Sequence, residues 1–135
     1  MAELTLLATL EKLDDVLAFL NQNLEEHHCS VKVRVQIAIA VEEIYVNIAH
    51  YAYDQEIGTA TIRMEVGGEP LQVSITFMDN GVPYDPLQKA DPDTKATLQD
   101  RAVGGLGIFM VKKSMDDIYY TYENGKNILT LKKKL

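Results

Sequence analysis

The sequence contains one cysteine and no long hydrophobic run, and both scarcities exclude classes of protein. Cys29 has no second cysteine with which to form an intramolecular disulfide, and no CxxC neighbour of the kind used by metal and redox sites. No stretch approaches the roughly 20 continuous apolar residues that cross a bilayer. The first ten residues also lack the basic segment of a secretory signal. We therefore expect a cytoplasmic protein with no membrane partner.

Basic residues are scarce as well. The chain has 13 Lys and Arg against 20 Asp and Glu, which gives a formal net charge of -7. A field of that sign repels the phosphate backbone of nucleic acids. The basic run Lys132–Lys134 is typical of a solvated tail rather than a binding patch. We expect no nucleic-acid partner.

The length and the hydrophobic content fit a single domain over residues 1–135. Of the 135 residues, 47% are hydrophobic, which is enough for one core. A short apolar segment over 4–9 is typical of an edge strand. Apolar residues at spacings of three and four predict a helix over 10–28 and a longer one that begins after Ser30 and continues to about 53.

The second half of the sequence alternates apolar and polar residues, as β-strands do. Two such runs flank the turn 67–70 and predict an antiparallel pair. A helix over about 106–115 is followed by two further strands that the turn 124–126 connects. Strands joined mainly by hairpins and mixed with helices predict an α+β fold, a two-layer α/β sandwich with a mixed, mainly antiparallel sheet.

The first polar cluster lies inside the long predicted helix. Glu43 and Asn47 are four residues apart and therefore share one face of it. An asparagine oxygen is a suitable ligand for Mg²⁺, and a carboxylate can orient or deprotonate a nucleophile. His50 follows three residues later and could reach the same site. A solvated polar stripe opposite the core is the alternative interpretation.

The second polar cluster follows an apolar strand. A buried carboxylate at Asp79 can accept a hydrogen bond from an amine such as the exocyclic group of adenine. Gly81 would allow the backbone to approach a flat ring closely. The alternative is an ordinary Asn-Gly turn.

The third cluster is a glycine-rich segment that opens a helix. It consists of Gly104, Gly105, Leu106 and Gly107. Unpaired N–H groups at a helix N-terminus attract phosphate oxygens. The alternative is a flexible loop, and neither the P-loop pattern nor GxGxxG is present.

The order of the three clusters resembles a known superfamily. They are similar to the N, G1 and G2 boxes of the Bergerat fold, which gyrase, heat-shock chaperone, histidine kinase and mismatch-repair ATPases share. The matching residues are Glu43 and Asn47, then Asp79, Gly81 and Pro83, then Gly105 and Gly107. The resemblance covers about residue 30 to the end. Within the superfamily, the segments 47–53 and 107–116 most resemble the anti-sigma factor serine/threonine kinases.

The resemblance implies a role for each matching residue. Asn47 would hold Mg²⁺ between the phosphates, and Glu43 would act as the base toward the attacking hydroxyl. Asp79 would bind adenine, and Gly81 would leave room for the ring. Thr130, on the last predicted strand, would support Asp79 through a hydrogen bond or a water molecule.

The same resemblance implies where the phosphates of ATP bind. Residues 87–103 would form the ATP lid, in which Lys95 and Arg101 are candidates for contact with the terminal phosphates. The glycine segment would bind the phosphates through Gly104, Gly105, Leu106 and Gly107. Which of these residues contacts a phosphate is open by one position.

The function implied is that of an Mg-ATP-dependent serine/threonine protein kinase that is also an anti-sigma factor. Its substrate would be an anti-anti-sigma protein, its other partner a sigma factor, and its assembly a homodimer. The alternative is a non-catalytic ATP-binding regulatory module, against which the presence of Glu43 argues, because binding alone needs no base. The catalytic domain of a histidine kinase fits less well, because no pair of dimerisation helices precedes it.

Overall fold

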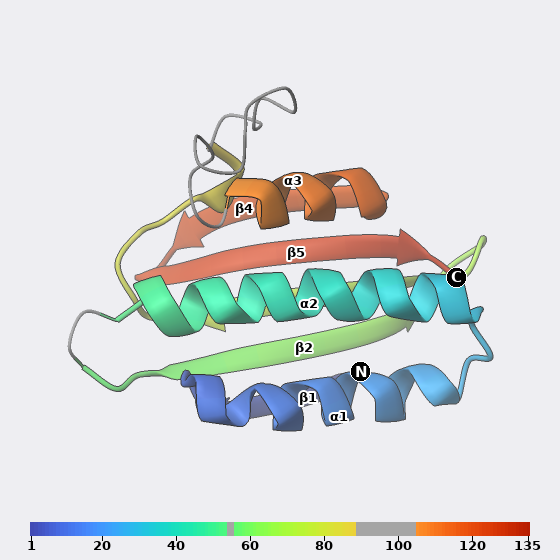
Figure 1. The fold of residues 1–135 in the computed structure, drawn as a ribbon, viewed down its shortest axis with the longest axis horizontal. Helices are drawn as coiled ribbons and strands as arrows, with labels where there is room; N and C mark the ends of the chain where they lie inside the picture. The colour runs from blue at the N-terminus through green and yellow to red at the C-terminus, as the bar shows by residue number, and fades with distance from the viewer. Residues whose placement is uncertain (54–55, 89–104) are drawn as a thin grey trace.

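The described residues form two layers, with the helices on one face of a five-stranded sheet (Figure 1). The structure is a computed structural model that describes residues 1–53, 56–88 and 105–135, with the backbone alone at 105 and 106. The strands are β1 (Ala2–Leu7), β2 (Thr59–Gly67), β3 (Gln72–Asp79), β4 (Asp117–Glu123) and β5 (Lys126–Lys134). They lie in the order β1-β2-β3-β5-β4.

Every pairing among the described strands is antiparallel. The predicted α+β sandwich is therefore confirmed, and its described strands are all antiparallel where we expected a mixed, mainly antiparallel sheet. Hairpins connect β2 to β3 and β4 to β5, as the turns in the sequence predict. The first segment forms the edge strand β1, which pairs with β2 alone in the described sheet.

In the part of the chain that the structure describes, three α-helices cover one face of the sheet. They are α1 (Leu13–Glu25), α2 (Val31–Tyr51) and α3 (Gly105–Ser114), and short 3-10 turns lie at Leu10–Lys12 and Pro86–Gln88. The Ser30 hydroxyl accepts a hydrogen bond from the Val33 N–H at 3.2 Å, which caps α2 as expected. No described helix is long and apolar enough to cross a membrane.

The first helix is shorter than the predicted 10–28. It begins after the 3-10 turn and ends at Glu25, because His28 adopts φ +51°, a left-handed conformation that cannot continue an α-helix. The second helix likewise stops at Tyr51, short of 53. Tyr53 instead links three segments, since its hydroxyl donates to the Thr59 carbonyl and accepts from the Asn80 N–H.

The core lies between the three helices and the inner face of the sheet. Inward residues of β2 and β3 alternate with outward ones, so Ile62, Ile75 and Phe77 are all buried. Tyr45 of α2 is fully buried, and its hydroxyl lies 2.7 Å from the Thr9 carbonyl, which satisfies the polar end of the side chain. This packing fixes α2 over β3 and β5, where the polar clusters meet.

Candidate functional site

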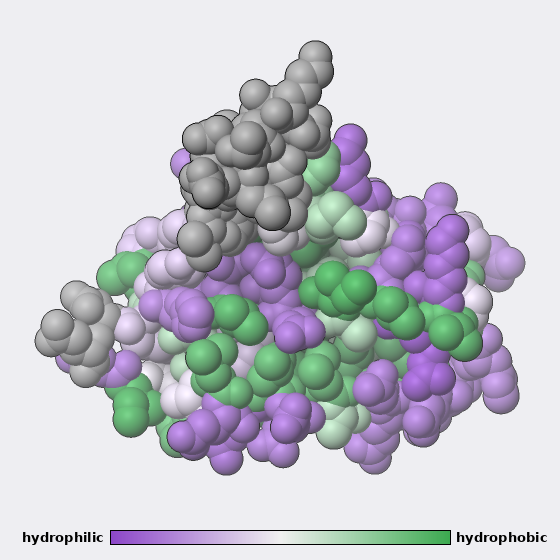
Figure 2. Space-filling view, in the orientation of Figure 1, coloured by the Kyte–Doolittle hydropathy of each residue, from purple (hydrophilic) through white to green (hydrophobic). Residues whose placement is uncertain are grey.

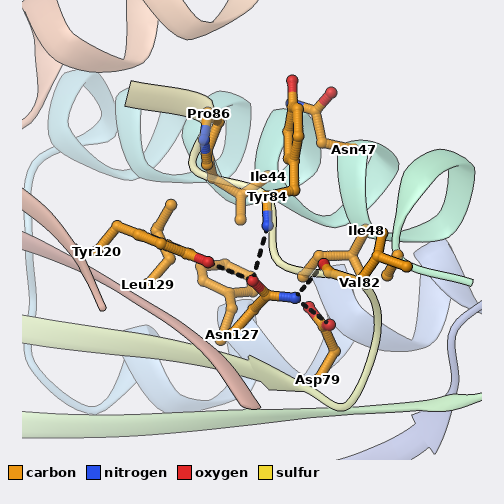
Figure 3. Close-up of a pocket in the computed structure, with 12 residues that line it drawn as sticks. Ile44, Asn47, Ile48, Asp79, Val82, Tyr84, Pro86, Tyr120, Asn127 and Leu129 are labelled. Atoms are coloured by element: carbon orange, nitrogen blue, oxygen red, sulfur yellow. Dashed lines mark hydrogen bonds between the residues drawn. The ribbon is translucent and has the colours of Figure 1, made fainter. Parts of the chain in front are cut away.

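A pocket of about 40 Å³ opens between α2, the ends of β3 and β5, and the loop that follows β3 (Figure 3). Its walls are mainly apolar, with a small number of polar groups at the base and along the helix. The lining residues are Ile44, Asn47, Ile48, Ala52, Phe77, Asp79, Val82, Tyr84, Pro86, Tyr120, Asn127 and Leu129. An apolar slot with a few convergent polar groups is the usual form of a small-molecule site.

Asp79 forms the polar base of this pocket at the end of β3. The residue is 6% exposed, and its Oδ1 accepts hydrogen bonds at 2.9 Å from both the Gly81 N–H and the Asn127 Nδ2. Burial raises the pKa of the Asp79 carboxyl, while the hydrogen bonds from Asn127 and Gly81 oppose that shift. The structure thus has the buried acceptor at the strand end that the sequence predicts.

Gly81 lies in the loop after β3, close against the end of α2. A Cβ added there would lie 2.1 Å from the carbonyl oxygen of Ala52, at the end of α2. The Val82 N–H donates to that same oxygen at 2.9 Å. The absent side chain therefore lets the loop close onto the end of the helix, while the role of Gly81 in leaving room for a ring stays a prediction.

Asn47 and Glu43 lie together on α2. The Asn47 Nδ2 is 3.4 Å from the Glu43 Oε1 and donates a hydrogen bond to it. Asn47 lines the pocket and is almost fully buried. Among the described residues its amide oxygen accepts no hydrogen bond, so this oxygen is available to a ligand.

The start of α3 packs against the same part of α2. A Cβ added to Gly107 would lie 2.1 Å from the carboxyl carbon of Glu43. The first N–H groups of an α-helix have no partner within the helix. The fold therefore brings the start of α3, with Gly105 and Leu106 in its first turn, against Glu43 of α2.

Two predicted site residues do not join the pocket. His50 is exposed on α2, with its ring 5.8 Å from that of Tyr51, and does not line the cavity. Thr130 lies on the outer face of the sheet and is hydrogen-bonded to Thr76 at 3.2 Å. The prediction that Thr130 supports Asp79 is wrong, because Asn127 has that position.

Several predictions fall outside the described residues. They concern Lys95, Arg101, Gly104 and all of the 87–103 lid beyond residue 88. The first two residues of the predicted lid, Leu87 and Gln88, belong to the 3-10 turn Pro86–Gln88.

Sequence reasoning missed Asn127, whose side chain makes four hydrogen bonds in the pocket. Its Nδ2 donates to Asp79 and, at 2.8 Å, to the Val82 carbonyl. Its Oδ1 accepts from the Tyr84 N–H at 3.0 Å and from the Tyr120 hydroxyl. A signal was present, because asparagine is disfavoured in strands and this one opens β5.

Comparison with known proteins defines the class to which this fold and pocket belong. The model of the histidine kinase-like ATPase domain matches residues 6–133, and the chain belongs to this family. The predicted resemblance to this superfamily is thereby confirmed.

Curated relatives are named as serine kinases. The chain is 29% identical over 102 residues to serine/threonine-protein kinase BtrW of Bordetella bronchiseptica, covering 76% of this chain and 71% of that protein. It is 30% identical over 98 residues to serine-protein kinase RsbW of Bacillus cereus, covering 70% of this chain and 60% of that protein. The chain thus spans about three fifths to seven tenths of these relatives' lengths.

A solved structure has the same fold. The crystal structure of the RsbU and RsbW domains of a Mycobacterium tuberculosis protein covers 100% of this chain and 33% of its own, with a TM-score of 0.67 and 16% sequence identity. At that sequence identity the similarity concerns the fold alone.

Proposed function

We propose that this chain binds Mg-ATP in the pocket and transfers its terminal phosphoryl group to a serine or threonine of an anti-anti-sigma protein. The observation that carries the proposal is the meeting of three elements at one place. The Asp79 pocket, the Glu43–Asn47 pair and the start of α3 come from segments far apart in the sequence. Relatives named as serine kinases support the same activity.

The base of ATP would occupy the apolar end of the pocket. Asp79 would accept a hydrogen bond from the exocyclic amine of adenine, while Ile44, Ile48 and Leu129 would contact the ring faces. A buried carboxylate is a costly group to maintain without a ligand, because burial disfavours its charged form. Such a group indicates a site adapted to binding rather than to stability.

The phosphates would extend from the ring toward the start of α3. The N–H groups of the first α3 turn, which includes Gly105, Leu106 and Gly107, and the positive end of the helix dipole suit phosphate oxygens. We also assign phosphate contacts to Lys95, Arg101 and Gly104 and the role of lid to residues 87–103. These assignments follow from the family resemblance.

The residues around Asn47 fit a magnesium ion. In ATP sites Mg²⁺ is usually held by one or two protein oxygens together with phosphates and water, and the Asn47 amide oxygen provides one such ligand. When bound, the ion would neutralise charge on the phosphates. A few protein oxygens, rather than a dense acidic cluster, are what such a site requires.

Glu43 would assist the attacking hydroxyl. Its carboxylate would accept the proton of the serine hydroxyl as that oxygen bonds to the terminal phosphorus and ADP leaves. Its hydrogen bond from Asn47 and its position against Gly107 would hold the carboxylate beside the phosphates. This is the feature that favours a kinase over an ATP-binding module without activity.

The partner proteins follow from the same family resemblance. We propose that the chain also binds a sigma factor, and that it does so in the cytoplasm as a homodimer. Protein interfaces need exposed apolar surface. On α2 the side chains of Val31, Val35 and Ile39 are at least half exposed and share one stripe, and Figure 2 shows hydrophobic surface along this helix.

Mg-ATP binding, measured by calorimetry, tests the proposal directly. The parent protein should bind at micromolar concentration, Asp79→Asn should lose binding, and Asn47→Ala should bind weakly or without magnesium dependence. Phosphoryl transfer to a candidate anti-anti-sigma protein is then measured with radiolabelled ATP, with Glu43→Gln as the variant expected to bind ATP but not transfer phosphate. A folded parent that binds no nucleotide would refute the kinase proposal.

A further inference from the structure

The side chain of Asn127 lies at the centre of a hydrogen-bond network under the pocket. It comes from the start of β5, directly opposite Asp79 in the strand register. Figure 3 shows its amide between the Asp79 carboxylate, the Val82 carbonyl and the Tyr84 backbone. The residue is 7% exposed, so these protein groups, rather than bulk solvent, satisfy its amide.

The orientation of this amide is fixed by its neighbours. The backbone N–H of Tyr84 can only donate, so the Asn127 atom 3.0 Å away is its oxygen. The carbonyl of Val82 can only accept, so the atom 2.8 Å from it is the Asn127 nitrogen. Asn127 therefore always presents an N–H, and never an oxygen, to Asp79.

The network occupies one oxygen of the Asp79 carboxylate. Its Oδ1 receives two N–H groups at 2.9 Å, from Gly81 and from Asn127. A carboxylate oxygen has two lone-pair sites, so Oδ1 is saturated. Within the described residues no hydrogen bond reaches Oδ2. Asp79 consequently offers a single oxygen to whatever enters the pocket.

A single acceptor distinguishes the two purine bases. Adenine has one exocyclic amine at the position where guanine has an oxygen acceptor, and guanine has its amine elsewhere. One free carboxylate oxygen pairs with the adenine amine but repels the guanine oxygen. Guanine turned to place its ring N–H and its amine on the carboxylate would need both oxygens, and Oδ1 is occupied.

We propose that Asn127 is a positioning residue that makes Asp79 a one-oxygen acceptor and thereby sets a preference for adenine over guanine nucleotides. The inference rests on the proposed function, since it concerns the base recognised by the same pocket. It gives a residue of β5 a role in nucleotide selection. The sequence motifs alone give that role to residues at the end of β3 and in the loop after it.

The first test compares ATP and GTP binding by calorimetry, with Mg²⁺, in the parent and in Asn127→Ala. Removal of the donor frees one lone pair of Oδ1 and loosens the carboxylate. Loss of a hydrogen bond to a charged group corresponds to roughly tenfold or more in affinity. ATP should therefore bind about tenfold more weakly, and the ATP-to-GTP affinity ratio should fall by about tenfold.

Thr76→Val is the matched control. Thr76 lies on β3 and makes a cross-strand hydrogen bond to β5, but on the outer face of the sheet, away from the pocket. This variant loses a β3–β5 side-chain bond, as Asn127→Ala does, and should keep the parent's ATP-to-GTP ratio. An equal loss of selectivity in both variants would show that sheet damage, not the Asn127 donor, is responsible.

Asn127→Asp provides a second readout that keeps the size of the side chain. The introduced carboxyl can donate to Asp79 only when it is protonated, and two adjacent carboxyls share one proton as pH falls. ATP affinity relative to the parent should therefore be low at pH 8 and recover toward pH 5. The inference is overturned if the ATP affinity of Asn127→Asp relative to the parent stays constant from pH 8 to pH 5. It is also overturned if Asn127→Ala keeps the parent's ATP-to-GTP affinity ratio.

Failure of the proposed function would be recognised separately. In that case the parent itself would bind neither ATP nor GTP, and the inference would fall with the proposal. If the parent binds ATP and the Asn127 variants keep its selectivity, the nucleotide site stands and only the role of Asn127 is refuted.

Discussion

Gly107 lies so close to Glu43 that a Cβ on the glycine would stand 2.1 Å from the carboxyl carbon. The contact joins the first turn of α3 to the middle of α2. It places the proposed base directly beside the helix start that would bind phosphate. A side chain at position 107 would have to displace the Glu43 carboxylate, which is the movable end of a flexible side chain.

Gly107→Ala should therefore reduce activity without unfolding the protein. The Glu43 carboxylate can swing away, and alanine is favoured over glycine in helices by about 1 kcal/mol, so the free energy of unfolding should change by less than about 1 kcal/mol. Phosphoryl transfer should fall by at least about tenfold because the base is displaced. Thermal unfolding and a radiolabelled transfer assay check both parts. Undiminished transfer would show that the position of Glu43 is unimportant.

Gly81→Ala should act in the opposite way, mainly on stability. Its Cβ would meet the backbone oxygen of Ala52 at 2.1 Å, and backbone at the end of α2 cannot move aside as a side chain can. We expect a loss of about 1–3 kcal/mol in the free energy of unfolding by urea.

The matched control for this variant is Gly67→Ala. A Cβ at that position has no atom within 4 Å, so the same substitution should change the free energy of unfolding by less than about 0.5 kcal/mol. Equal effects at positions 81 and 67 would contradict the contact between the loop and the end of α2.

The pH dependence of stability should reveal the buried carboxylate. Because the folded state raises the pKa of Asp79 above the ordinary 3.8, the folded state holds that proton more firmly than the unfolded chain. The contribution of Asp79 to stability is thus fully present below pH 3.8 and is lost as pH rises through the raised value.

Asp79→Asn removes this titration while retaining an oxygen for the Gly81 and Asn127 donors. The variant should accordingly gain stability relative to the parent as pH rises from 4 to 7, although it loses ATP binding. Urea unfolding at the two pH values measures the difference. A parent and variant that keep a constant gap in unfolding free energy would show that Asp79 titrates normally.

The exposed stripe on α2 provides a test of the proposed homodimer. Ile39→Asp adds charge at a side chain that is 55% exposed, so it should change the free energy of unfolding by less than about 0.5 kcal/mol. If the stripe joins two copies, light scattering should show the parent as a dimer and the variant as a monomer. A parent that is monomeric at all concentrations would contradict the homodimer.

Local signals in the sequence predicted most of the fold. The Ser30 cap, the helical spacing of α2 and the alternation in β2 and β3 each depend on residues close in the chain. The position of Asp79 at a strand end follows from the same alternation. These features were predictable because neighbouring residues determine them.

The partner of Asp79 was not predictable in this way. It depends on the register between β3 and β5, which pairs Asp79 with Asn127, 48 positions further along the chain. Residues 127 and 130 are separated by three positions, and an odd separation puts their side chains on opposite faces of a strand. Thr130 is for that reason outside the pocket, however suitable its hydroxyl. The close approaches of Gly81 and Gly107 likewise arise between distant segments.

The length of α2 has a mechanical consequence. Its 21 residues extend over about 30 Å as one continuous helix, with Glu43 and Asn47 in one half and Val31, Val35 and Ile39 in the other. At the C-terminal end of α2, Tyr53 bonds to Thr59 of β2 and to Asn80 after β3, and Gly81 lies against Ala52. Because α2 is one continuous helix, a tilt at the end that carries Glu43 and Asn47 would also move the exposed apolar residues at its other end.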